Sequence, residues 1–163
     1  MILNPLTLIN IVLVAPEIPQ NTGNIIRLCA NTGARLHLVE PLGFSLDDAM
    51  VRRASLDYRD IADVVVHKSF DDVLLPLKID RVYGTVPDGP VLYDLPVYER
   101  NDTIVFGSES TGLPTDIIQK LPARNRLRIP MMPSNRSLNL ANAVAIIVYE
   151  MWRQLHYVGN KGI

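Results

Sequence analysis

Three polar segments of the chain contain the residue types from which a ligand site could be built. They are Asn21-Thr-Gly-Asn-Ile-Ile-Arg27, Phe106-Gly-Ser-Glu-Ser-Thr-Gly-Leu-Pro114 and residues 129–149, which begin Ile129-Pro-Met-Met-Pro-Ser-Asn-Arg-Ser137. Each segment is typical of a strand that ends in a polar loop and continues into a helix. The last helix carries almost no charge, which favours a buried element whose first turn faces a ligand. We therefore expect the three segments to form one composite site.

Apolar, β-branched runs alternate with helical patterns along nearly the whole chain. The predicted strands are residues 8–14, 36–39, 63–67, 81–86, 103–106 and 127–131, and the predicted helices are residues 24–30, 47–55, 70–77, 116–121 and 138–157. Continuous apolar strands that alternate with helices indicate a single α/β domain with a mostly parallel sheet and helices on both faces. Ligands of such sheets bind beyond the carboxyl ends of the strands. The loops after Val14, Val86, Phe106 and Met131 are therefore the candidate positions.

Composition excludes several classes of protein. The 163 residues fit one domain, and 48% hydrophobic with 20% charged residues is an ordinary globular composition. No apolar run reaches the ~18 residues of a membrane span, and the start of the chain lacks the pattern of a secretory signal, so we expect a cytoplasmic protein. Cys29 is the only cysteine and the three histidines lack ligand spacing, so no disulfide or metal site is expected.

Charge and short motifs say less about the ligand. The net charge of -1 does not favour a nucleic-acid partner, although arginines cluster at positions 52–53 and 124–128. Neither the glycine-rich dinucleotide motif nor the P-loop motif is present, which disfavours both kinds of nucleotide site. Ser69 followed by Asp72 is typical of a helix start.

The last helix has an apolar surface wider than one sheet requires. Its polar residues fall near one stripe, namely Asn139, Asn142, Tyr149, Glu150 and Arg153. A helix that packs on a single sheet needs an apolar stripe of only about 100°. We therefore predict a homodimer, with the following residues buried against the sheet or the partner: Val144, Ile147, Val148, Met151 and Trp152. The alternative is that the asparagines only brace the helix start, with Ser137 as its N-cap.

The three segments resemble the three motifs of the SPOUT class of RNA 2′-O-methyltransferases, both in their order along the chain and in their residues. The similarity is closest to the small, single-domain TrmL (YibK-like) branch, which methylates the wobble ribose of certain tRNAs, and it covers essentially the entire chain. It implies a C-terminal deep trefoil knot, a homodimer, and S-adenosylmethionine bound in the knot loops. One departure is Ala141, where related sequences often carry a small hydroxyl residue.

The resemblance also implies roles for individual residues. The expected cofactor-binding positions are Thr85, Gly107, Ile129 and Ser137. Arg27 would lie beside the target nucleotide as the catalytic residue. Because an arginine keeps its proton, we expect it to hold a phosphate and stabilise the developing alkoxide rather than to act as a base. Tyr149 would contact RNA, and Glu109 is a second candidate for proton handling.

Purely structural interpretations of the same residues also stay open. Gly107 is also typical of an ordinary turn at the end of a strand, and Arg27 could form an ion pair on a helix surface. Tyr149 could lie in a dimer interface. In a dimer, residues Arg27, Arg52, Arg53 and Arg136 would gather around one groove.

The resulting hypothesis is an S-adenosylmethionine-dependent enzyme that methylates the ribose 2′-hydroxyl of the wobble cytidine or uridine in tRNA anticodon loops. Residues 1–157 would form the methyltransferase domain and residues 158–163 a flexible tail. The alternatives are methylation of ribosomal RNA, a knotted domain that binds cofactor or RNA without catalysis, and an unrelated nucleotide- or flavin-binding α/β protein.

Overall fold

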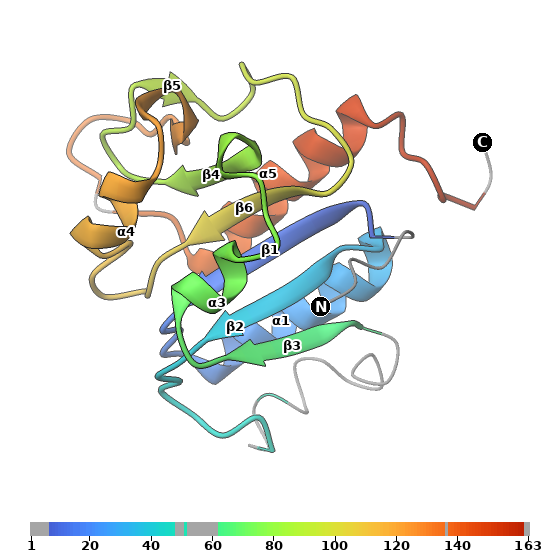
Figure 1. The fold of residues 1–163 in the computed structure, drawn as a ribbon, viewed down its shortest axis with the longest axis vertical. Coiled ribbons are helices and arrows are strands. Elements are labelled where there is room, and N and C mark those ends of the chain that lie inside the picture. Colours follow the sequence, from blue (N-terminus) through green and yellow to red (C-terminus); the bar gives the residue numbers. More distant parts are fainter. Residues whose placement is uncertain (1–6, 48–50, 52–61, 136, 162–163) are drawn as a thin grey trace.

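The strands form one parallel sheet in the computed structural model, which describes residues 7–47, 51, 62–135 and 137–161. The strands are β1 (Ile9–Val14), β2 (Arg35–Val39), β3 (Val64–His67), β4 (Val82–Thr85), β5 (Val91–Leu92), β6 (Asp102–Phe106) and β7 (Arg126–Arg128). Their order is β3-β2-β1-β6-β4-β7-β5, and every described pair of neighbours is parallel (Figure 1). The predicted parallel α/β sheet is confirmed.

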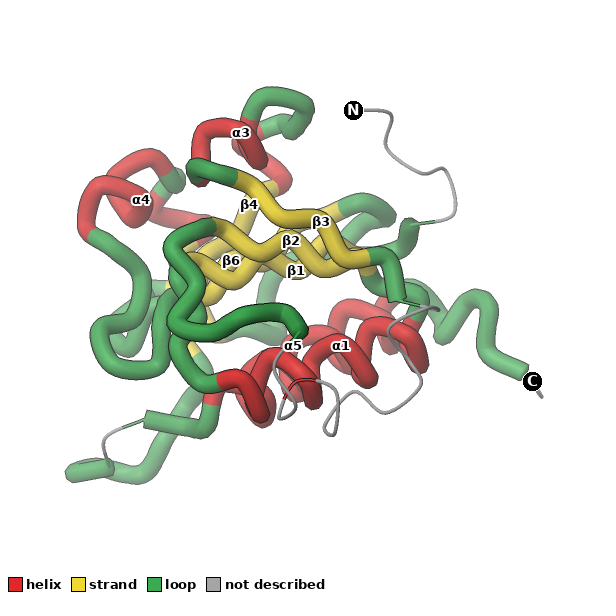
Figure 2. Tube along the Cα trace, turned by 90° about the horizontal axis from the view of Figure 1, so that it is seen from below, coloured by secondary structure: helices red, strands yellow, loops and turns green. Residues whose placement is uncertain are grey.

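Helices cover both faces of the sheet, as predicted. Helices α1 (Pro19–Thr32) and α5 (Leu140–Gln154) lie on one face, and α3 (Phe70–Leu74) and α4 (Thr115–Lys120) lie on the other (Figure 2). Two short 3-10 turns, η2 (Ile79–Arg81) and η3 (Ala123–Asn125), precede β4 and β7. Alternate residues of the fully buried β1 divide between two cores: Ile9, Ile11 and Leu13 pack with α1 and α5, and Val12 and Val14 pack with α3 and α4.

Helix α1 begins earlier than the sequence pattern indicated. The predicted start was Asn24, whereas the helix begins at Pro19, a residue whose fixed φ suits the first helical position. Asn21, Thr22 and Gly23 are therefore helical and buried, and the first polar segment is not a loop. The pattern placed the start too late because polar residues favour a solvated loop, whereas Asn21 is hydrogen-bonded inside the protein.

Helix α5 is shorter than predicted at both ends. It begins at Leu140 rather than 138, and its N-cap is Asn139, so the prediction of Ser137 as N-cap was wrong. It ends at Gln154 because His156 and Tyr157 have positive φ angles of 56° and 50°, which a right-handed helix cannot contain.

The remaining elements agree with the sequence with small differences. Ser69 and Asp72 form the predicted capping box, although α3 ends at Leu74 rather than at residue 77. Strand β5, only two residues long, fell inside a stretch expected to be a loop. Of the predicted helix 47–55, Asp47 lies in a turn and Val51 is helical. The rest of that helix lies outside the described residues.

Strand β7 lies between two strands that follow each other in sequence. Leu127 pairs with Thr85 of β4 on one side and with Val91 of β5 on the other. The connection 86–90 must therefore pass over β7. A Cβ added to Gly89 would lie 2.7 Å from the Leu127 carbonyl carbon, so the two backbones are in direct contact. Arg128 fastens this crossing by donating to the Gly89 carbonyl oxygen at 2.8 Å.

Candidate functional site

Three of the predicted cofactor positions lie at the carboxyl ends of neighbouring strands. Thr85 ends β4, Gly107 follows β6 and Ile129 follows β7. Strand β4 lies between β6 and β7, and the register pairs Gly84 with Val105 and Thr85 with Leu127. The three positions therefore share one edge of the sheet. The fourth, Ser137, is exposed in the segment that leads to α5.

The Gly107 loop is folded tightly on itself. A Cβ at Gly107 would lie 1.8 Å from the Gly112 carbonyl carbon and 2.0 Å from the Leu113 nitrogen. The turn is closed by the Gly112 N–H, which donates to the Ser108 carbonyl oxygen at 2.9 Å. Glycine is thus required by the protein's own backbone, independently of any ligand. The loop presents Glu109, half-buried, toward the start of α1.

The Glu109 carboxylate accepts three hydrogen bonds from the beginning of α1. The backbone N–H groups of Glu17 and Ile18 donate to it at 2.8 Å and 3.1 Å, and Asn21 Nδ2 donates at 3.0 Å. The side chain of the N-cap residue Ile18 cannot accept a hydrogen bond, so the Glu109 carboxylate from a distant loop caps the helix instead. A negative charge at a helix N-terminus is also favoured by the helix dipole.

Glu17 in turn contacts the loop that carries Glu109. Its carboxylate accepts from the Ser110 backbone N–H at 3.0 Å and from the Ser110 hydroxyl at 2.7 Å. The residues before α1 and the loop after β6 are therefore clamped in both directions. Because this pairing uses both carboxylates as acceptors of several bonds, it favours a positioning role for Glu109 over proton handling.

Asn21 connects this clamp to the last polar segment. Asn139 Nδ2 donates to Asn21 Oδ1 at 2.9 Å. Asn139 Oδ1 accepts from the backbone N–H groups of Ala141 and Asn142 at 2.9 Å and 3.3 Å, and so caps α5. The three polar segments therefore meet through side chains, as the composite-site prediction required.

The roles of Asn21 and Glu17 were missed in the sequence. One signal was available: the chain enters α1 through Glu17-Ile-Pro-Gln20, with no Ser, Thr, Asp or Asn at the N-cap position. A helix start without its own cap needs a partner from elsewhere.

Arg27 and Tyr149 lie in the helical layer rather than at the strand ends. Arg27 is exposed on α1, which runs beside α5 (Figure 2). Tyr149 is 46% exposed, and its ring packs edge-on against Trp152 with centroids 5.8 Å apart. The stripe predicted on α5 is exposed at Asn142, Tyr149 and Arg153, and Ile146 belongs to it too.

The apolar residues of α5 predicted to meet the sheet or a partner are buried within this one chain. They are Val144, Ile147, Val148, Met151 and Trp152, none more than 8% exposed. The exposed large apolar side chains that remain on α5 are Ile146 and Tyr149, 36% and 46% exposed, and Leu138 just before the helix is 39% exposed.

Most of the arginines that suggested RNA binding have structural partners. Arg124 pairs with Asp80 at 2.5 Å, and Arg126 and Arg128 donate to the carbonyl oxygens of Leu121 and Gly89. The predicted groove residues 52, 53 and 136 lie outside the described part of the chain.

The described residues give little support to a metal site, a cysteine nucleophile or a membrane span. They contain no group of three or more metal-ligating side chains. Burial raises the pKa of the Cys29 thiol to about 12, so it stays protonated and is a poor nucleophile. Within the same residues, no helix is long and apolar enough to cross a membrane.

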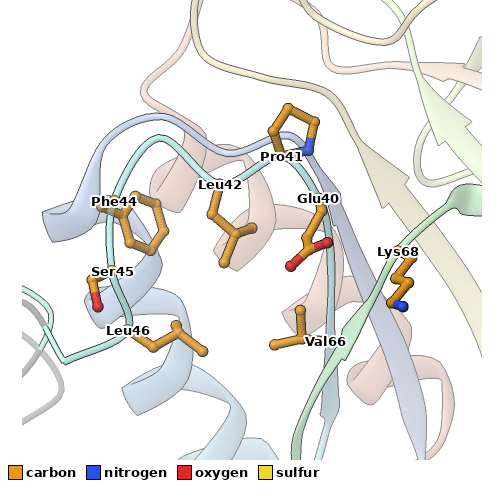
Figure 3. A pocket seen from close by; sticks show the side chains of 8 residues that line it. All are labelled: Glu40, Pro41, Leu42, Phe44, Ser45, Leu46, Val66 and Lys68. Atoms are coloured by element: carbon orange, nitrogen blue, oxygen red, sulfur yellow. The ribbon is translucent and has the colours of Figure 1, made fainter.

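An open hollow of about 690 Å³ lies beyond β2 and β3, away from the predicted site residues. Leu42, Leu46 and Val66 point into it, with Glu40 and Lys68 at its rim (Figure 3). The loop that forms it is held by the Gly43 N–H, which donates to the Pro16 carbonyl oxygen at 2.9 Å. None of the residues implied for cofactor or catalysis lines this hollow, so it is not part of the candidate site.

Comparisons with known proteins agree with the geometry. Residues 8–149 match the model of the SpoU rRNA Methylase family. A tRNA (cytidine(34)-2′-O)-methyltransferase of Aeromonas hydrophila is 53% identical over 153 residues, which cover 94% of this chain and 98% of that protein. These matches confirm the resemblance drawn from the three polar segments.

Two solved structures are similar in fold. One, from work on the 2-OH methylation of C/U34 on tRNA, is 41% identical with a TM-score of 0.85, and the match covers 91% of this chain and 96% of that one. The other is the SpoU methyltransferase AviRb of Streptomyces viridochromogenes in complex with AdoMet. It is 25% identical with a TM-score of 0.83, and the match covers 94% of this chain and 60% of that one.

Proposed function

This chain belongs to the SpoU rRNA methylase family, and from that premise we propose that it transfers the methyl group of S-adenosylmethionine to the ribose 2′-hydroxyl of the wobble nucleotide, cytidine or uridine 34, of tRNA. The observation that carries the proposal is the junction at Asn21, where all three methyltransferase-like segments meet. The choice of nucleotide is supported by the relative from Aeromonas hydrophila, which matches this chain over nearly its whole length.

The cofactor would lie along the edge formed by β6, β4 and β7, held by Thr85, Gly107, Ile129 and Ser137. The residues present suit it: the half-buried Ile129 is followed by Met131, Met132 and Leu138, which are 37%, 76% and 39% exposed. Such exposed apolar side chains beside strand ends offer the wall that an adenine ring requires. When bound, the cofactor supplies the activated methyl group. The AdoMet complex of the similar AviRb supports the choice of cofactor.

The protein's task in this reaction is to align the ribose hydroxyl and to stabilise the charge that develops on its oxygen. Alignment alone can lower a barrier by about 7–11 kcal/mol in favourable cases. Arg27, exposed on α1, would hold the adjacent phosphate with its guanidinium fork and stabilise the developing alkoxide. Its permanent charge makes it unsuited to act as a simple base.

RNA would approach the helical layer, where Tyr149 is available for stacking. A second copy of the chain would cover Ile146 and Leu138 and bring further cationic residues to the same groove, which would make the groove locally basic although each chain has a net charge of -1. The predicted homodimer is supported by this exposed apolar surface, and sedimentation at micromolar concentration tests it directly.

We propose in addition that the C-terminal part of the chain is threaded as a trefoil knot. Strand β7 runs beneath the earlier connection 86–90, and the segment after it leads away to α5 on the face of the sheet shared with α1. With this substrate the protein would act in the cytoplasm, with residues 1–157 as its methyltransferase domain.

The test uses the purified protein, S-adenosylmethionine with a labelled methyl group, and either total tRNA or ribosomal RNA. We expect label in tRNA, at nucleotide 34, when nuclease fragments are analysed by mass spectrometry. Label in ribosomal RNA alone would replace this proposal with the runner-up substrate. Cofactor and RNA binding without any transfer would show a binding module instead of an enzyme.

A further inference from the structure

The polar contacts around α1 have a feature that the methyltransferase assignment does not account for. The first turn of α1 is held by side chains from two other segments, Glu109 after β6 and Asn139 before α5. Between these segments and residues 15–27, no backbone hydrogen bond is found among the described residues. Strands β1 and β6 are paired up to Leu13 and Phe106, and beyond those ends the contacts between the segments are made by side chains.

Asn21 occupies the centre of this arrangement. Its side chain is 5% exposed, and it donates through Nδ2 to Glu109 and accepts through Oδ1 from Asn139. Only an amide can do both at once at this size, because a carboxylate lacks the donor and a hydroxyl is too short to span the two partners. The position thus selects asparagine for its two opposite hydrogen-bonding ends.

Both partners of Asn21 lie next to predicted cofactor positions. Glu109 follows Gly107 by two residues in a loop closed tightly by Gly112. Asn139 follows Ser137 by two residues and fixes the first turn of α5. Each predicted cofactor segment is therefore joined by a side-chain hydrogen bond to the first turn of α1.

Arg27 lies on the same helix, six residues after Asn21, which is about 9 Å along the axis. A helix is stiff over so short a distance, so its first turn sets the position of Arg27. We infer that Glu109 and Asn21 are positioning residues that place Arg27 relative to the bound cofactor, so that cofactor binding and the placement of the catalytic arginine are coupled. This inference rests on the proposed function, and its test includes a readout that does not require methyl transfer.

The first experiment measures steady-state kinetics of Asn21→Asp and Glu109→Gln on tRNA. Asn21→Asp removes the donor and sets two carboxylates against each other, whereas Glu109→Gln weakens the contact by removing the charge and one of the two acceptor oxygens. We expect kcat to fall at least 10-fold in each, with the affinity for S-adenosylmethionine changed less than 3-fold. Asn31→Asp adds the same charge at an exposed position of the same helix and should keep kcat within 2-fold.

The double variant separates positioning from general damage. Combining Asn21→Asp with Glu109→Gln reverses the polarity of the pair, because the new amide can donate to the new carboxylate. We expect a kcat at least 3-fold higher than the product of the two single effects predicts. Purely additive losses would show that the two residues act separately and would overturn the inference.

The second experiment follows amide hydrogen exchange in the intact protein with and without S-adenosylmethionine. In the wild type the cofactor should slow exchange in residues 19–27, and in Asn21→Asp this slowing should be lost while the cofactor still binds. Slowing that persists in Asn21→Asp would overturn the coupling even if tRNA is methylated. Absence of methylation by the wild type would instead count against the proposed function, and the exchange result would still decide the inference.

Discussion

Two networks of polar side chains join distant parts of this chain, and they do so in different surroundings. The site network links Glu109, Asn21 and Asn139 near the surface, between loops and helix starts. The buried row links Asn10, His37 and His67 across β1, β2 and β3, with a His37–His67 distance of 2.9 Å. The strands that carry the buried row are already fixed by parallel backbone ladders. The segments that carry the site network lie beyond the paired ends of β1 and β6, where no ladder continues.

The buried row has one consistent set of donors and acceptors. Asn10 Nδ2 donates to the Asn101 carbonyl oxygen at 3.0 Å, so its Oδ1 must accept from His37 Nε2. His37 Nδ1 then carries no proton and accepts from His67 Nε2. Burial lowers the pKa of both rings, which favours the neutral form of each in the folded protein. The row is closed, as expected for buried polar groups.

The difference indicates what each network controls. Side chains that cross an existing ladder change the stability of the sheet but hardly its geometry. Polar side chains that join three segments beyond the ends of their strands adjust the geometry of whatever those segments bind. We therefore expect changes in the site network to affect the reaction more than stability, and changes in the buried row to do the reverse.

The largest effect on activity should come from Arg27, which the site network places. Arg27→Ala removes the proposed stabilisation of the alkoxide and the adjacent phosphate, and we expect kcat/KM to fall about 100- to 1,000-fold, the usual loss of one strong electrostatic donor. Arg27→Lys keeps the charge but loses the fork, and it should recover only part of the rate. Tm should shift by less than 2 °C because the side chain is exposed. Wild-type activity in Arg27→Lys would contradict the role of the fork.

The buried row should govern how stability depends on pH. Burial, followed by the nearby His67, lowers the pKa of His37 to about 4, whereas an unfolded histidine titrates near 6.5. Burial lowers the pKa of His67 as well. Between these limits the unfolded state binds protons that the folded state does not, so the free energy of unfolding falls as the pH drops from about 6.5 to about 4.

For His37 the slope is at most about 1.4 kcal/mol per pH unit, and it vanishes above about pH 7. Urea unfolding of the wild type and of His37→Gln at pH 7, 6 and 5 measures it. The variant should be less stable at pH 7 but lose less stability on acidification. An equal loss in both proteins would show that other groups control the acid response.

The two networks also explain what the sequence could and could not reveal. The strands were visible because each is a continuous apolar run, buried on both faces, such as the fully buried β1. The start of α1 was not visible, because Asn21 and Thr22 look solvated until their surroundings are known. The partners of Asn21 are 88 and 118 residues away, beyond the reach of any local pattern.

Helix α5 shows a second limit of the sequence. Its apolar width was plain, but the pattern could not tell the chain's own sheet from a partner's surface. Ile147 and Met151 are fully buried within one chain, while the preceding Ile146 stays partly exposed. The cofactor positions were selected by resemblance and by strand ends together. Their common edge follows from the order β6-β4-β7, which no local pattern contains.

Asn139 belongs to the site network and is also a helix cap, so its substitution should lower both the stability of the protein and kcat, each to a moderate extent. Asn139→Ala removes the acceptor for the Ala141 and Asn142 N–H groups and should cost about 1 kcal/mol of stability, or about 2–4 °C in Tm. It also removes the donor to Asn21, so kcat should fall several-fold. Asn139→Asp keeps the cap but loses that donor, and should therefore restore Tm without restoring kcat. Recovery of both together would remove the distinction between capping and positioning.

The smallest effect should come from Ala141, the departure from related sequences. Its backbone N–H is already satisfied by Asn139 Oδ1 at 2.9 Å, and its side chain is half-buried in the first turn of α5. Ala141→Ser adds a hydroxyl at a place where the polar groups of the described site network already have partners. Both Tm and kcat should therefore stay close to the wild type, with a change in stability of at most about 0.5 kcal/mol. Calorimetry with S-adenosylmethionine gives the sharper measurement. A gain of more than 3-fold in affinity would mean that the cofactor, rather than the network, uses this position, and the boundary of the site would have to be extended into α5.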